Sequence, residues 1–138
     1  MKVLLVILIL MPSLAFADRC PDLTGKYMVQ SEDGQVHYSI NQDECLQITI
    51  ERTTNHSGKN VKEKHTFALD GVLHPGGWDD AGDNGKSSAK FVSGKLELTF
   101  VSPSGEVISK EIWELLHDKN IEIKEMNGKT ALAKKQRR

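Results

Sequence analysis

The sequence has little that would point directly to chemistry. Its 18 lysine and arginine residues nearly balance its 19 aspartate and glutamate residues, and the formal net charge of −1 gives no reason to expect a nucleic-acid partner. It has no glycine-rich phosphate-binding loop and no Gly-x-Ser-x-Gly motif that would mark a nucleophilic serine. Beyond the first seventeen residues, no apolar run is long enough to cross a membrane. We therefore expect a binding protein that is not an enzyme, holds no cofactor and does not span a membrane.

Metal-binding spacings are also missing. The five histidines include no His-x-His or His-x₃-His pair. The loop Trp78–Gly85 is rich in aspartate and glycine, which suits calcium. Counted from Asp80, however, the calcium-loop pattern meets Gly82 at its third position and Phe91 at its twelfth, where it needs oxygen ligands. We predict no metal site and expect a solvated loop here.

The first seventeen residues have the order of a secretory signal. Lys2 supplies one positive charge, Val3–Leu14 is almost wholly apolar, and Ala15-Phe16-Ala17 is the small-x-small pattern that a signal peptidase cuts. The apolar run of about a dozen residues is too short to span roughly 30 Å of hydrocarbon. We expect residues 1–17 to be removed and residues 18–138 to form one domain, secreted or periplasmic.

Only two cysteines are present, Cys20 and Cys45. An even pair in an exported chain usually forms a disulfide, and two buried free thiols are the alternative. The bridge would close a loop of about 25 residues, which in the chain-entropy treatment stabilises the fold by roughly 3–3.5 kcal/mol. It would also hold the start of the domain against the sheet.

The rest of the sequence predicts eight or nine short strands joined by tight turns. Leu46, Ile48 and Ile50 alternate with polar residues, as in a half-buried strand. Segment 106–116 also fits one face of a helix, but its β-branched and aromatic residues favour a strand. We predict strands at residues 23–30, 35–41, 45–54, 61–69, 88–93, 96–102, 106–116, 121–126 and 130–135, with a further short segment at 72–74.

This succession favours an all-β fold, an antiparallel up-and-down meander of about eight strands that closes into a barrel. Closure removes the exposed strand edges that a meander would otherwise leave. An eight-stranded barrel has an interior that side chains nearly fill or that holds one small ligand. A sandwich of two sheets is the alternative.

Short motifs along residues 18–138 resemble small bacterial lipocalin-like, calycin-type secreted proteins. Leu23-Thr24-Gly25-Lys26-Tyr27 is similar to the Gly-x-Trp start of lipocalin-like barrels, with Tyr27 in place of the tryptophan. The other similar motifs are Phe67-Ala68-Leu69-Asp70-Gly71 before His74-Pro75, Ala89-Lys90-Phe91, Gly94-Lys95-Leu96 and Asn127-Gly128-Lys129. The resemblance implies a barrel that binds a small apolar molecule, and it implies no catalytic residue.

Inward-facing apolar residues are the candidate ligand lining. A barrel with a filled core would have the same residues. A ligand-binding barrel and a filled barrel both require apolar side chains at every second position, facing inward. Glu63 and His65 share a predicted face with Phe67, either as polar ligand contacts near an open mouth or on a stretch that faces solvent. The lining candidates are Leu46, Ile48, Ile50, Phe67, Leu69, Leu96, Leu98, Phe100 and Trp113.

A protein-binding module, such as an inhibitor of a secreted enzyme, is the alternative function. Its surface would be the loop Gly76–Gly85, with Trp78 as an exposed aromatic anchor. A small apolar ligand and a protein partner therefore both remain open at this point.

Overall fold

Residues 20–32, 34–78 and 84–137, the part described in this computed structural model, form one antiparallel sheet of ten strands. The first five are β1 (Gly25–Ser31), β2 (Gly34–Asp43), β3 (Gln47–His56), β4 (Lys59–Ala68) and β5 (His74–Pro75). The others are β6 (Lys86–Val92), β7 (Lys95–Val101), β8 (Val107–Leu115), β9 (Ile121–Glu125) and β10 (Thr130–Lys135).

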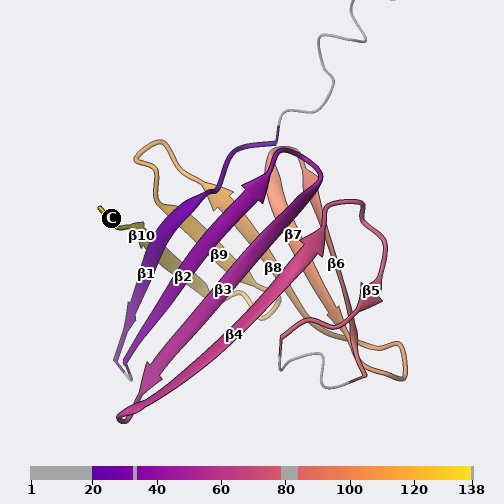
Figure 1. The fold of residues 1–138 in the computed structure, drawn as a ribbon, viewed down its shortest axis with the longest axis horizontal. Helices are drawn as coiled ribbons and strands as arrows, with labels where there is room; N and C mark the ends of the chain where they lie inside the picture. The colour runs from indigo at the N-terminus through magenta and orange to yellow at the C-terminus, as the bar shows by residue number, and fades with distance from the viewer. Residues whose placement is uncertain (1–19, 33, 79–83, 138) are drawn as a thin grey trace, which may run out of the picture.

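The strands follow the order β4-β3-β2-β1-β10-β9-β8-β7-β6-β5, so the first and last strands are neighbours. The β1–β10 ladder is short, pairing Tyr27 with Lys135 and Met28 with Lys134. With β1 and β10 paired, the sheet curves until β4 lies beside β6. These two strands are not paired with each other in the sheet (Figure 1). We call the line along which β4 faces β6 the β4–β6 seam. The barrel is thus closed by strand ladders everywhere except at this seam, where the N–H of Gly71, just after β4, donates a 2.9 Å bond to the carbonyl of Ala89 on β6.

The predicted all-β meander and barrel are confirmed, and the sandwich is wrong. Ten strands form where eight or nine were expected, because the short segment near His74 pairs with β6 as the two-residue strand β5. The segment that also fitted a helix is the strand β8. None of the described residues lies in a helix.

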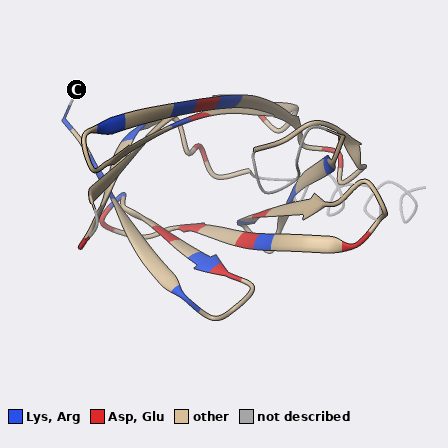
Figure 2. Cartoon of the chain, turned by 90° about the horizontal axis from the view of Figure 1, so that it is seen from below, with Lys and Arg blue, Asp and Glu red and all other residues tan. Residues whose placement is uncertain are grey.

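No helix capable of crossing a bilayer occurs in the described ranges. Charges of both signs are distributed over the barrel (Figure 2).

Alternation places one face of each strand inside the barrel. Ile48 and Ile50 on β3 and Leu98 on β7 are fully buried, and each such side chain contributes about 1.5–3 kcal/mol through removal from water. Leu46, which we expected on the same face as Ile48, is instead 68% exposed. It lies before β3 begins, in a turn closed by a 3.0 Å bond from its N–H to the carbonyl of Asp43. The strand periodicity therefore does not reach it.

The disulfide between Cys20 and Cys45 is present, with the two Cα atoms 5.6 Å apart. Near the bridge, the Leu23 side chain is buried and the hydroxyl of Tyr27 donates a 2.9 Å bond to the Leu23 carbonyl. The entry into the domain is therefore held against the barrel, as the cysteine pair predicted. The expected signal segment, residues 1–17, lies outside the described residues.

Candidate functional site

A glycine pair carries the chain into the barrel at the β4–β6 seam. Gly76 has φ of 98° and Gly77 has φ of 144°, which L side chains rarely adopt. A Cβ on Gly76 would lie 3.0 Å from the His65 ring on β4, and a Cβ on Gly77 would lie 3.3 Å from Ser87 on β6. These two positions therefore require glycine for both conformation and space, and they sit between the two strands of the seam.

Trp78, the next residue, is buried in the core and not exposed. Its side chain is 2% exposed and stacks on Phe100, with ring centroids 5.5 Å apart and planes 26° apart. Phe67 meets it edge to face at 5.7 Å, and Trp113 lies 6.5 Å away. The prediction that Trp78 is an exposed anchor for a protein partner is wrong, because Gly76 and Gly77 turn the chain inward and burial of the indole removes a large apolar surface from water. Residues 79–83 of the predicted loop surface lie outside the described residues.

Arg52 covers the same indole. The carbon of its guanidinium lies 4.3 Å from the Trp78 ring centroid, within the range of a cation–π interaction. Its Nη2 and Nε both donate to Oε1 of Glu63, at 2.6 and 3.1 Å. Burial by itself lowers the pKa of Arg52, but the hydrogen bond and negative charge of Glu63 outweigh it and the pKa is raised. Arg52 is therefore a permanent charge inside the barrel.

Sequence reasoning missed Arg52, although a signal was available. The inward alternation of Ile48 and Ile50 continues to position 52, and the β3–β4 register places Arg52 opposite Glu63. An inward arginine facing an inward glutamate across two strands predicts an ion pair.

Glu63 and His65 turn toward the interior, while their neighbours Lys62 and Lys64 are exposed. The interpretation that this stretch of β4 faces solvent is therefore wrong. Glu63 is tolerated because Arg52 compensates its charge. Burial lowers the pKa of His65, whose ring meets Phe67 edge to face at 4.6 Å.

The two tryptophans differ in their hydrogen bonding. The indole N–H of Trp113 donates a 3.0 Å bond to Oε1 of the buried Glu111. The indole N–H of Trp78 is also buried but finds no acceptor among the described residues. Tyr38 packs edge to face on Trp113 at 5.0 Å, and burial raises the pKa of Tyr38 to about 12, with the charge of Glu111 adding to the effect. Tyr38 is therefore a neutral phenol at physiological pH.

A pocket of about 250 Å³ lies at the β4–β6 seam. Phe67 and Ala89 form buried parts of its wall, and the buried Ser87 faces it from β6. We call it the seam pocket; its lining is Gln47, His65, Thr66, Phe67, Ala68, His74, Pro75, Ser87, Ser88 and Ala89.

His74 lies in this lining next to an acidic partner. Its Nε2 is 2.8 Å from Oδ2 of Asp70. The N–H of Val72 and then this contact with His74 hold the pKa of Asp70 below its usual value. The pair holds the imidazole of His74 in place beside the pocket.

The predicted lining residues mostly pack against one another. Of the nine, only Phe67 borders the seam pocket. Leu69 is half-buried and packs on the core from outside it. The remaining inward residues are fully buried core side chains, namely Ile48, Ile50, Leu96, Leu98, Phe100 and Trp113. Their role in ligand binding stays a prediction.

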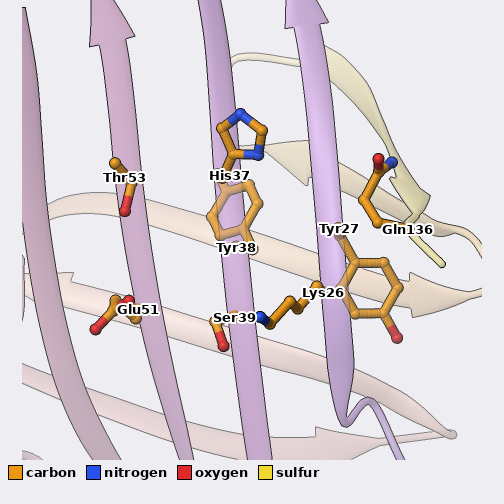
Figure 3. Close-up of a pocket in the computed structure, with 8 residues that line it drawn as sticks. All are labelled: Lys26, Tyr27, His37, Tyr38, Ser39, Glu51, Thr53 and Gln136. Atoms are coloured by element: carbon orange, nitrogen blue, oxygen red, sulfur yellow. The ribbon is translucent and has the colours of Figure 1, made fainter. Parts of the chain in front are cut away.

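A second pocket, of about 370 Å³, lies over β1, β2 and β3. Cross-strand pairing places Lys26, Ser39 and Glu51 in one row, and His37 opposite Thr53 in the next. Figure 3 shows these side chains spread over three strands instead of converging on one point. The arrangement is a shallow groove without a catalytic constellation. Within the described ranges, no group of three or more His, Cys, Asp or Glu residues could hold a metal ion.

No protein-family model matches the chain, and no curated protein sequence matches it. In structure it is similar to a mutant of the fluorescent protein UnaG, with a TM-score of 0.56 over 83% of this chain and 96% of that one. The two sequences are 10% identical, so the likeness concerns the fold alone. Bacterial origin and secretion, which the sequence motifs implied, stay predictions. The chain therefore has an antiparallel β-barrel fold similar to that of this fluorescent protein.

Proposed function

We propose that the protein binds a small, mainly apolar ligand non-covalently at the β4–β6 seam. The observation that carries this proposal is the seam pocket, where the buried ring of Phe67 meets a few polar groups from both strands. Binding sites for small molecules are concave and mostly apolar, with a small number of polar groups that orient the ligand. His65, His74 and the buried Ser87 are polar groups of this lining, together with Gln47, Thr66 and Ser88.

The seam is also the part of the barrel where a ligand can enter at least cost. All other neighbouring strands in the sheet are joined by backbone hydrogen bonds, which would have to break to admit a molecule. Side chains at the seam can shift without such a loss. The pocket volume of about 250 Å³ lies just below the usual range for ligand sites of about 300–1,000 Å³, which indicates a small ligand.

Filling the seam pocket should remove binding. Ala68 is half-buried and lines the pocket, so Ala68→Phe should weaken binding of the neutral, apolar fluorescent probe N-phenyl-1-naphthylamine at least tenfold, or about 1.4 kcal/mol. The matched control is Ala131→Phe, a half-buried alanine on β10 away from the pocket, which should leave the affinity unchanged. Fluorescence titration of the three proteins measures this. Equal affinities would place the site elsewhere, and a wild-type protein that binds no apolar probe would overturn the proposal.

We also infer that the protein is exported through its first seventeen residues. The Cys20–Cys45 disulfide supports this, because structural disulfides persist mainly in oxidising compartments. Protein recovered from the medium or the periplasm should begin at Asp18 when its amino terminus is sequenced. Recovery of a chain that begins at Met1 would contradict export with cleavage.

A further inference from the structure

Trp78 differs from its aromatic neighbours in the kind of segment to which it belongs. Tyr38, Phe67, Phe100 and Trp113 all lie within strands, and each is held by a hydrogen-bonded ladder. Trp78 comes from the connection between β5 and β6, directly after the glycine pair. Its side chain can therefore leave the core without breaking a strand pair, whereas the rings around it cannot.

The space that holds Trp78 is shaped for a flat aromatic ring. Phe100 offers a stacked face at 5.5 Å, and Arg52 lies over the ring at 4.3 Å. Stacking and cation–π contacts both require a π face and give little to a saturated ring of equal size. Because Glu63 already balances the charge of Arg52, the site does not call for a negatively charged ligand.

Trp78 fills this space, but its indole N–H makes no hydrogen bond to the described residues. Its buried indole N–H has no acceptor among the described residues, and an unpaired buried donor is unfavourable. Release of the indole to water would satisfy that donor. A flat ring without an N–H would then occupy the same space without the penalty.

The space is adjacent to the seam pocket. Phe67 lines that pocket and also contacts the Trp78 ring edge to face at 5.7 Å. Removal of the indole would therefore free a volume that shares the Phe67 ring as a wall with the pocket of about 250 Å³.

We propose that the ligand is a neutral, flat aromatic molecule that enters at the seam and displaces the Trp78 indole from Phe100 and Arg52. This inference rests on the proposed function, and it specifies the class of ligand and the residue that competes with it. Trp78 acts as an internal occupant of the site, so the filled interior and a ligand-binding role are compatible.

The indole N–H signals in the nuclear magnetic resonance spectrum of the ¹⁵N-tryptophan-labelled protein test this inference. The chain has two tryptophans, and Trp113→Phe assigns the signals. Benzofuran, which has the shape of indole without its N–H, should expose Trp78 and raise the solvent exchange of its indole proton at least tenfold. The Trp113 signal should stay protected. Hydrindane, a saturated two-ring molecule of similar size, should not expose Trp78.

The outcomes separate this inference from the function on which it rests. If, in uniformly ¹⁵N-labelled protein, benzofuran shifts backbone signals of the seam pocket while Trp78 stays protected, displacement is overturned and ligand binding at the seam stands. If hydrindane exposes Trp78 equally well, the preference for a flat ring is overturned. If neither probe changes any signal of the pocket, both proposals fail.

A variant gives an independent measurement. Trp78→Ala removes the internal occupant and should bind benzofuran at least tenfold more tightly than the wild type does. Leu132→Ala on β10, a half-exposed apolar residue away from the site, should leave the affinity unchanged. A Trp78→Ala protein that folds but binds no more tightly than the wild type would overturn competition by Trp78.

Discussion

Replacement of Arg52 by alanine should lower the free energy of unfolding by about 3 kcal/mol, the lower end of the range for breaking a buried ion pair, because this pair is only partly buried. The substitution removes the guanidinium that donates to the Glu63 carboxylate, whose side chain is 14% exposed. It also removes the guanidinium from the face of Trp78. Urea unfolding followed by circular dichroism measures the loss.

Two comparisons show whether loss of the Arg52–Glu63 ion pair is the cause of the lower stability. The double variant Arg52→Met, Glu63→Leu should recover most of the stability, because replacing both partners of a buried pair with apolar residues is often neutral. Lys62→Ala removes an exposed lysine whose Nζ lies 4.0 Å from Oε1 of Glu51, and should change stability by less than about 1 kcal/mol. A double variant as unstable as Arg52→Ala would show that lost packing dominates, and not the charge of Glu63 without Arg52.

Replacement of Phe100 by alanine should lower the free energy of unfolding by about 3–5 kcal/mol, as truncation of a fully buried phenylalanine does. Phe100 is completely buried and contacts both Trp78 and Phe67, so its loss opens a cavity at the centre of the barrel. Thermal and urea unfolding measure the effect. The same variant should also weaken binding of benzofuran, because the stacked face is gone.

The control for Phe100 is Phe91, a half-buried phenylalanine at the edge of the same core. Phe91→Ala should lower the free energy of unfolding clearly less than Phe100→Ala does. Less apolar surface returns to water, and solvent can fill the space. Equal losses for the two variants would mean that the barrel interior near Phe100 is looser than its burial indicates.

Much of the fold follows from local patterns in the sequence. The alternation of Ile48 and Ile50, and likewise of Leu96, Leu98 and Phe100, has the period of a strand and predicts which face is buried. Two cysteines, the only ones in the sequence, predict a bridge with each other, and the structure contains that bridge. Such patterns need only the neighbours along one strand or the count of one residue type.

Less of the candidate site could be predicted from the sequence. An aspartate- and glycine-rich stretch predicts a solvated loop and an exposed Trp78 at its start. Its burial depends on the space left between β4 and β6 and on the Phe100 ring, which are distant in sequence. Leu46 shows the opposite error, since its apolar side chain is exposed where a turn replaces the expected strand.

The sequence by itself therefore determined the all-β class, the meander, most of the buried set and the pairing of the cysteines, since each depends on short-range periodicity or on composition. Only the tertiary structure decided where the barrel stays open, which side chain fills its interior and how charge is held there. Those features depend on register and closure, which bring Arg52 opposite Glu63, and β4 beside β6, from separate parts of the chain. A packed interior depends on the volumes of side chains that meet only after the sheet closes, and no single stretch of sequence contains that information.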